Sequence, residues 1–293
     1  MTIRDISFDG IIENISELDS WLCERGIGER ARLNRLGQIV RRVKFLVDFR
    51  KDPLLETDND RFELMWGLME AKEFSGIFPF IKEWHKDNPD YIKRKLEVIL
   101  MGTDSPGDET PVNNESRNTL FELVLAGILA GNGVDIRFES NADLAVHTNW
   151  GPIYIECKRP YSNKSLRSNV LKAEKQLVRR LRTTTNARGA IAISVSRVIN
   201  PDLRLLCGPT HKAILEKLED EQRVVAERHL NILTTIDEKK IILALFHMSA
   251  PAEVDGKLSS GQLISAFALP GRITDDHDIL EYIRSRLNPG TAV

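Results

Sequence analysis

Asp143, Glu156 and Lys158 are the residues of this 293-residue sequence whose types and spacing best suit catalysis. Side chains alternate along a β-strand, so Glu156 and Lys158 should share one face of a strand expected over residues 152–158. Cys157 lies between them and points to the opposite face, where we expect a buried structural thiol rather than a nucleophile. The sequence therefore offers a carboxylate and an ammonium side by side on one strand.

A tight turn before this strand would add a second carboxylate to the same face. If residues 149–150 form a two-residue turn, Asp143 lies directly opposite Glu156, with Cβ atoms about 4.5–5.5 Å apart. A three-residue loop with Gly151 in the left-handed conformation would instead rotate Asp143 away. In the first register the carboxylates repel each other, and a divalent cation such as Mg²⁺ or Mn²⁺ removes that cost. Lys158 would then be placed to orient a water molecule or to stabilise charge on a phosphate.

An aspartate, twelve intervening residues and a Glu-x-Lys triplet make up this pattern, which resembles the PD-(D/E)XK nuclease superfamily. The resemblance covers residues 117–198 and implies a restriction-endonuclease-like fold. It also implies that Asp143 and Glu156 bind one or two Mg²⁺ ions, joined by the main-chain carbonyl of Cys157. In such enzymes the residue matching Lys158 assists the attacking water.

The resemblance suggests two accessory residues. The first core helix of such enzymes often supplies an acid, and Glu122 interrupts the otherwise apolar helical stretch 120–130. The alternative is that Glu122 is an exposed acid in the first turn of its helix. Gln176 matches a glutamine found near the active site in many members, although it also suits a solvated helix surface. The sequence departs from the superfamily's motif at Ala142, where the motif name has Pro.

A concentration of positive charge follows the candidate site. Residues 158–188 contain ten basic residues and one acidic residue, although the whole chain has a net charge of −2. Such a cluster is typical of proteins that bind a phosphate backbone, and its alternative is a solvated helix face. The nucleic-acid contacts expected here are Arg159, Lys164, Arg167, Lys172, Lys175 and Arg179.

The first part of the sequence is expected to be entirely helical. Apolar residues recur at helical spacing in four segments, residues 16–25, 29–50, 61–74 and 91–101. A stretch rich in Gly, Pro, Asp and Ser then marks a linker at residues 102–111. We therefore expect a helical region over residues 1–110, serving recognition, dimerisation or regulation, and a nuclease-like domain over 111–293.

The second part alternates between strands and helices, so the expected fold class is α/β (α+β). The pattern predicts the element order αβββαβ, and the resemblance implies that these elements form a restriction-endonuclease-like core with a mixed central sheet flanked by helices. Its elements are expected at residues 117–130, 134–139, 142–147, 152–158, 165–183 and 190–198. A helix at 210–230, strands at 240–248 and 262–269 and a helix at 275–287 follow.

Composition excludes several classes of protein. The near-neutral net charge excludes a globally basic nucleic-acid binder, and three widely spaced cysteines exclude a disulfide framework and a cysteine-rich zinc site. No phosphate-binding Gly-x4-Gly-Lys-Ser/Thr loop is present, so the chain itself is not expected to be an ATPase. No apolar run is long enough to span a membrane, and no secretory signal is visible, which favours a cytoplasmic protein without a membrane partner.

Together with the resemblance, these features predict a Mg²⁺-dependent nuclease that hydrolyses phosphodiester bonds, with DNA as the expected substrate. The alternative is a nuclease-fold module that has lost activity and binds nucleic acid or assembles with a partner. A homodimer, or a partner chain such as an ATPase or helicase, is compatible with either prediction. Restriction and antiphage defence are the settings that suit a nuclease joined to a helical control region.

Overall fold

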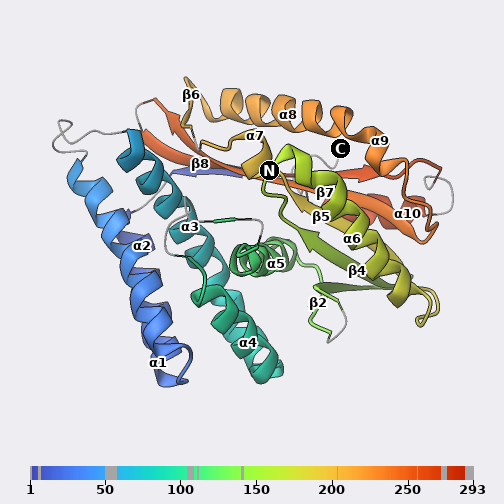
Figure 1. Cartoon of the computed structure of the whole chain (residues 1–293), viewed down its shortest axis with the longest axis horizontal. Helices are drawn as coiled ribbons and strands as arrows, with labels where there is room; N and C mark the ends of the chain where they lie inside the picture. Colours follow the sequence, from blue (N-terminus) through green and yellow to red (C-terminus); the bar gives the residue numbers. More distant parts are fainter. Residues whose placement is uncertain are drawn as a thin grey trace.

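The computed structural model describes residues 2–5, 8–49, 58–103, 109–110, 112–139, 142–202, 204–255, 257–271 and 276–287. A helical N-terminal region is followed by a mixed β-sheet with helices on its faces (Figure 1). This confirms the expected mixed α/β class. Among the described residues, no helix is both long enough and apolar enough to cross a membrane.

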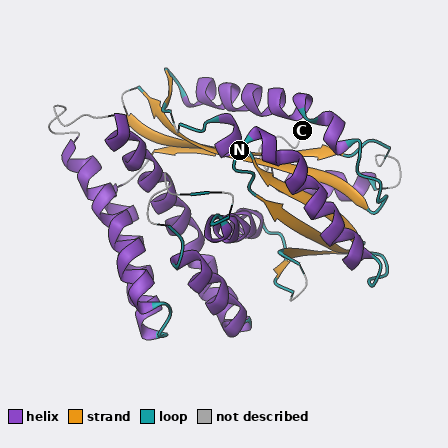
Figure 2. Cartoon of the chain, in the orientation of Figure 1, coloured by secondary structure: helices purple, strands orange, loops and turns teal. Residues whose placement is uncertain are grey.

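Four helices form the bulk of the N-terminal region. They are α1 (Phe8–Glu24), α2 (Glu29–Phe49), α3 (Asp58–Asp87) and α4 (Pro89–Leu100). The helix expected over residues 61–74 is only part of α3, which spans 30 residues and continues through Pro79. In Figure 2 these helices stand as one group beside the strands.

One sheet contains all the described strands. Its order is β1-β8-β7-β5-β4-β3-β2, and β6 pairs in addition with β7. The strands are β1 (Thr2–Asp5), β2 (Ile136–Arg137), β3 (Leu144–Thr148), β4 (Gly151–Lys158), β5 (Arg188–Ser194), β6 (Leu206–Gly208), β7 (Ile241–Val254) and β8 (Lys257–Ala268). Strands β2, β3 and β4 form an antiparallel meander, whereas β5 runs parallel to β4.

The remaining helices cover the two faces of this sheet. They are α5 (Glu115–Gly131), α6 (Asn163–Leu181), α7 (Ser196–Ile199), α8 (His211–Arg228), α9 (Leu230–Leu233) and α10 (His277–Leu287). Apolar residues of α5 and α10 pack on one face, together with those of α1 to α4. Apolar residues of α6 and α8 pack on the opposite face, where both helices lie along the sheet in Figure 1.

The structure corrects three expectations about secondary structure. The N-terminal region is not entirely helical, because β1 precedes α1 and pairs with β8. The strand expected at 134–139 is reduced to the two residues of β2. The strand expected at 190–198 ends at Ser194, and α7 takes up its last residues.

The hydrophobic core is continuous between the parts of the chain before and after residue 110. A single cluster of buried apolar side chains runs from α1 through α5 to the inner face of β4, including Ile15, Leu68, Leu125 and Ile155. Burying apolar area at about 25 cal/mol per Å² is the main stabilising term in folding. The helical region and the sheet are therefore stabilised by the same buried surface.

The β3–β4 hairpin has the two-residue turn that the sequence predicts. Thr148 pairs with Gly151 and Leu144 pairs with Ile155 in the antiparallel register. Gly151 has a φ of +117°, and a Cβ atom built on it would lie 2.4 Å from the carbonyl oxygen of Asn186. Residue 151, beside the turn, must therefore be glycine. Because Leu144 pairs with Ile155, the next pair of positions in the same register places Asp143 opposite Glu156.

His247 makes the fold sensitive to acid. Its imidazole is buried on β7, 3.3 Å from Ser194 Oγ and 3.1 Å from Gln262 Nε2. Burial, and then the charge of Arg159, lowers the pKa of His247 to about 4. A histidine that titrates lower in the folded state stabilises the fold above its ordinary pKa of about 6.5, and this contribution is lost as the pH falls through 4.

We expect His247→Gln to flatten the loss of stability between pH 6.5 and pH 4. The difference in pKa bounds the effect at about 3 kcal/mol in the free energy of unfolding. Urea denaturation at several pH values measures it, and His277→Gln at an exposed position is the matched control. An unchanged pH dependence in His247→Gln would contradict the assignment.

Candidate active site

The ends of two neighbouring strands bring Asp143, Glu156 and Lys158 together. Asp143 directly precedes β3, and Glu156 and Lys158 lie in the last three residues of β4. Asp143 Oδ2 accepts a hydrogen bond of 2.8 Å from the main-chain N–H of Cys157. This bond fixes the first carboxylate against the strand that carries the second.

The ammonium of Lys158 lies between Asp143, Glu156 and the Cys157 carbonyl. Its Nζ lies 3.1 Å from the carbonyl oxygen of Cys157, 3.3 Å from Glu156 Oε2 and 3.7 Å from Asp143 Oδ2. The side chains of Lys158 and Glu156 are 14% and 2% exposed, so these contacts are largely shielded from water. The ammonium therefore contacts the same three oxygen donors that the resemblance assigns to a metal ion.

The cysteine between them faces away, as expected. Cys157 packs with Ile153 and Ile155 in the core on the α5 side of the sheet. Burial, and then the nearby charge of Asp143, raises the pKa of the Cys157 thiol well above its ordinary value. A thiol with such a pKa is unreactive at neutral pH. Only the main-chain carbonyl of this residue can serve the site.

Glu122 belongs to the same cluster and has a partner that the sequence did not reveal. Its residue is 7% exposed, and its carboxylate accepts a hydrogen bond from Lys95 Nζ of α4. The alternative of an exposed first-turn acid is wrong, because α5 begins at Glu115 and buries Glu122 further along the helix. The helical region thus contributes a cation, Lys95, to the candidate site.

Arg180 is a second partner that the sequence analysis missed. Its Nη1 lies 3.0 Å from Glu156 Oε1, and its guanidinium carbon lies over the Tyr154 ring, 5.3 Å from the ring centroid. Gln176, the residue expected here, lies one helical turn earlier on α6 and is exposed. Among the described residues, no hydrogen bond joins Gln176 to the carboxylates. Helical spacing from Gln176 is the signal that could have pointed to Arg180.

Burial and mutual repulsion raise the pKa of two of these carboxyls. The pKa of Glu122 and that of Glu156 both rise to about 7, first because burial disfavours the charged form and next because Asp143 lies close to each. Lys158 opposes both shifts. Without a further cation, part of this cluster is protonated near neutral pH.

The oxygen atoms of the site suit a hard divalent cation. Asp143, Glu156 and the Cys157 carbonyl are the type of donor that Mg²⁺ and Mn²⁺ prefer, and binding would relieve the repulsion that raises the two pKa values. No three His, Cys, Asp or Glu side chains form a ready ligand group in the described part of the chain. Binding of a divalent cation at this site therefore requires the main-chain carbonyl of Cys157 as a ligand and displacement of the Lys158 ammonium.

The basic surface expected beside the site is present on α6, with one exception. Five of its members are exposed, and they are Lys164, Arg167, Lys172, Lys175 and Arg179. Arg159 is different, since it is 7% exposed and ion-paired with the buried carboxylate of Glu109. The expectation that Arg159 contacts nucleic acid is wrong for this conformation, because the N-terminal region covers it.

No family model, no curated protein and no solved structure matches this chain.

Proposed function

We propose that the chain is a metal-dependent nuclease that hydrolyses phosphodiester bonds in DNA. The observation that carries this proposal is the meeting of Asp143, Glu156, Lys158 and the Cys157 carbonyl at the end of one strand. Two carboxylates, a carbonyl and a lysine at one point are the groups needed to bind Mg²⁺ beside an attacking water. The resemblance of these residues to the PD-(D/E)XK pattern points the same way.

The connectivity around the site supports the proposal. An antiparallel meander β2-β3-β4 leads through α6 to β5, which pairs in parallel with β4. Helix α5 packs on one face of these strands and α6 on the other. This αβββαβ order is the one that the resemblance to restriction-endonuclease-like folds implies.

Each residue of the site has a role in this proposal. Asp143, Glu156 and the Cys157 carbonyl would hold Mg²⁺ or Mn²⁺, which when bound polarises the phosphate and lowers the pKa of a bound water. Lys158 would turn from the carboxylates towards the water or the phosphate oxygen. Arg180 keeps Glu156 in place through its 3.0 Å contact. Glu122, paired with Lys95, places a further carboxylate beside the site.

The substrate is inferred from charge. Five exposed basic side chains on α6 follow the site in sequence, and phosphate groups of a nucleic acid are the partners for such a surface. We propose DNA as the substrate and the cytoplasm as the place of action, in restriction or antiphage defence. A homodimer, or a partner ATPase or helicase, would supply a second active site or strand separation. Gln176, exposed on α6, would then be a contact for substrate.

One observation favours the alternative function. The Lys158 ammonium already donates hydrogen bonds to Glu156 and to the Cys157 carbonyl and lies 3.7 Å from Asp143 Oδ2, so the cation of this cluster can be the lysine itself. A module with this cluster could keep the fold as a nucleic-acid-binding or assembly unit without turnover. The two functions differ in whether a divalent cation displaces Lys158.

The decisive experiment measures cleavage and metal binding on the same preparations. Plasmid, linear duplex and single-stranded DNA are incubated with the wild type, Glu156→Gln and Asp143→Asn, with Mg²⁺ or with EDTA. We expect Mg²⁺-dependent cleavage by the wild type and its loss in both variants. We also expect Mg²⁺ to raise the melting temperature of the wild type, and this rise to disappear in Glu156→Gln.

The control replaces an acid of the same sheet region that lies outside the site. Asp135 is exposed and pairs with Arg137 on the surface, so Asp135→Asn should cleave DNA like the wild type. Absence of cleavage and of any metal-induced stabilisation in the wild type would favour the inactive module. Cleavage that survives in both site variants would exclude this site as its source.

A further inference from the structure

A hollow lies between the helical region and the sheet. Its volume is about 330 Å³, and its walls come from α3, α5, β7 and β8. Sites that bind small molecules have volumes of about 300–1,000 Å³. The hollow reaches the surface at Gly76 of α3, which is exposed, and its walls include none of the residues of the candidate active site. It is therefore a separate feature of the fold, large enough for a small molecule.

The helices give the hollow an apolar wall. The side chains that form it are Met69, Ile77 and Phe80 of α3 and Val124 and Ile128 of α5. Aliphatic and aromatic side chains of this kind contact the faces of a flat ring. This wall therefore suits an apolar or aromatic surface of a ligand.

The sheet gives the hollow a polar floor. A Cβ atom built on Gly261 would lie 2.4 Å from Leu218 of α8, so position 261 faces the opposite side of the sheet. Side chains alternate along a strand, and Ser260 and Gln262 accordingly line the hollow. Ser249 of β7 pairs with Gln262 and lines the same floor. Hydroxyl and amide groups thus lie opposite the apolar wall.

One hydroxyl of this floor lacks a partner. Ser260 is 1% exposed, and its Oγ has no hydrogen bond among the described residues. A buried hydroxyl left without a hydrogen bond costs about 1–3 kcal/mol, and native proteins leave few such groups unpaired. The unpaired hydroxyl indicates that a molecule in the hollow supplies the missing hydrogen bond.

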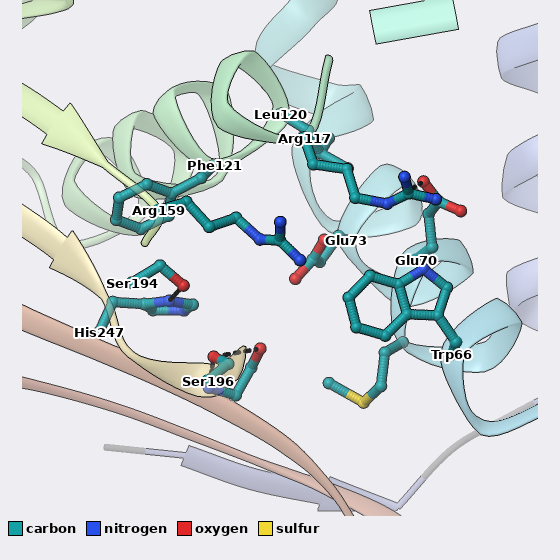
Figure 3. A pocket seen from close by; sticks show the side chains of 12 residues that line it. Trp66, Glu70, Glu73, Arg117, Leu120, Phe121, Arg159, Ser194, Ser196 and His247 are labelled. Carbon is teal, nitrogen blue, oxygen red and sulfur yellow. Dashed lines mark hydrogen bonds and ion pairs between the residues drawn. The ribbon is translucent and has the colours of Figure 1, made fainter. Parts of the chain in front are cut away.

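Glu73 is a second group of the hollow without a partner. It lines both the hollow and an adjoining cavity of about 40 Å³, in which Figure 3 shows its carboxyl beside the Arg159 guanidinium. Among the described residues, Glu73 makes no hydrogen bond and no ion pair. Burial raises the pKa of Glu73 to about 7, although the charge of Arg159 opposes this shift. A carboxyl group is therefore available to a ligand.

The charges around the hollow favour an uncharged ligand. Lys72 and Glu73 are the charged residues among its described walls, so the walls carry no excess of either sign. The positive charges of Arg159 and Arg117 act on Glu73 and would repel a cationic amine. An uncharged N–H donor avoids this repulsion and can still bond the carboxyl.

A nucleobase with an amino group combines these properties. Its amino N–H donates to a carboxyl oxygen whether Glu73 is ionised or protonated, and carboxylates recognise the amino group of cytosine in this way. Its flat ring packs on apolar and aromatic side chains such as Phe80. Its other polar atoms can bond the hydroxyl of Ser260.

We propose that this hollow binds an uncharged nucleobase that carries an amino group, adenine or cytosine, and that Glu73 recognises the amino group. Ser260 bonds a second polar atom of the base, and Phe80 contacts its ring. This inference does not depend on the proposed nuclease activity, because binding is measured without cleavage. Two sources share this chemistry, a free nucleoside and an unpaired base of a nucleic-acid strand.

The test measures the binding of nucleosides by calorimetry and by thermal stability. Cytidine is compared with uridine and adenosine with inosine, since the second of each pair has a carbonyl oxygen in place of the amino group. We expect cytidine and adenosine to bind the wild type and to raise its melting temperature. Uridine and inosine should bind about tenfold more weakly, because their carbonyl oxygen cannot donate to the carboxyl. Glu73→Gln should lose this discrimination, since an amide can pair with either edge.

Two further variants complete the test. Ser260→Ala should weaken the binding of cytidine about threefold or more, while its ligand-free melting temperature equals or exceeds that of the wild type, because an unpaired buried hydroxyl is removed. This variant keeps the test valid if Glu73→Gln does not fold. Glu83→Gln changes an acid of α3 whose side chain is 69% exposed, and it should bind like the wild type.

The same measurements identify the source of the base. Tighter binding of a cytidine trinucleotide than of cytidine would identify a strand, and tighter binding of cytidine would identify a free nucleoside. Failure of all four nucleosides to bind the wild type would overturn the proposal. Full discrimination between cytidine and uridine in folded Glu73→Gln would overturn it as well.

Discussion

Replacing Lys158 with methionine is expected to abolish DNA cleavage while leaving the protein folded and able to bind Mg²⁺. The ammonium is the group best placed to orient water or to stabilise the developing phosphate charge, and such groups contribute about 10²- to 10⁴-fold to rate. Methionine keeps most of the packing volume of the side chain. Single-turnover cleavage of plasmid DNA in Mg²⁺ measures the effect.

The same variant should bind the divalent cation more tightly. Lys158 Nζ now contacts the Cys157 carbonyl and both carboxylates, so a metal ion must displace it. Removing the ammonium removes this competition, and we expect a larger Mg²⁺-induced rise in melting temperature than in the wild type. Lys86→Met, at an exposed position of α3, should change neither quantity. Cleavage at the wild-type rate by Lys158→Met would exclude a catalytic role for this residue.

Arg35→Ala is expected to cause the largest loss of stability of any substitution considered. Arg35 and Glu70 form an ion pair in which the side chains are 1% and 4% exposed, and Arg35 Nη1 also donates to Ser116 Oγ at 3.2 Å. Removing one partner of a buried pair leaves the other charge uncompensated, which costs about 3–5 kcal/mol. Urea or thermal denaturation at pH 7.5 measures this loss.

The loss should depend on pH in a defined direction. Burial by itself would raise the pKa of Glu70, but Arg35 and then Arg117 outweigh it and hold the pKa below its ordinary value. Without Arg35 the pKa of the buried Glu70 carboxylate should rise, because the largest of the charges that lower it is removed. The stability deficit of the variant should therefore be greatest at high pH, where Glu70 is ionised, and should shrink as the pH is lowered.

A surface pair provides the comparison for Arg35. Arg223 and Asp220 lie 2.5 Å apart, but their side chains are 65% and 68% exposed. Arg223→Ala should change stability by no more than about 0.5 kcal/mol, since exposed ion pairs contribute little. A deficit for Arg35→Ala as small as this would show that Glu70 has another partner.

The candidate site could be predicted where its geometry depends on local rules. The two-residue turn at 149–150 fixed the pairing of β3 and β4, and the alternation of strand side chains then placed Glu156, Lys158 and Cys157. These steps need only short-range information. The same holds for α6, whose apolar residues Val170 and Leu177 face the core as their spacing predicts.

The partners of the site could not be predicted, because they come from distant elements. Lys95 reaches Glu122 from α4, and Arg180 reaches Glu156 from α6. The spacing of Lys95 does not distinguish a buried ion pair from a charge on a solvated helix, and the helical spacing of Arg180 from Gln176 indicates only the side of α6 on which Arg180 lies. The burial of Arg159 was also unpredictable, because it requires Glu109 and Trp66 from the N-terminal part of the chain.

The first strand of the chain has a consequence for dissecting this protein. β1 pairs with residues 259–262 of β8, so four residues from the start of the sequence cover part of the β8 edge at the end of the sheet opposite β2. A fragment that begins after residue 110 would lack β1 and would expose main-chain N–H and C=O groups along this edge of β8. Exposed strand edges of this kind promote aggregation through strand pairing between molecules. Truncated variants of the protein should therefore include residues 2–5, either in the same polypeptide or as a separate peptide.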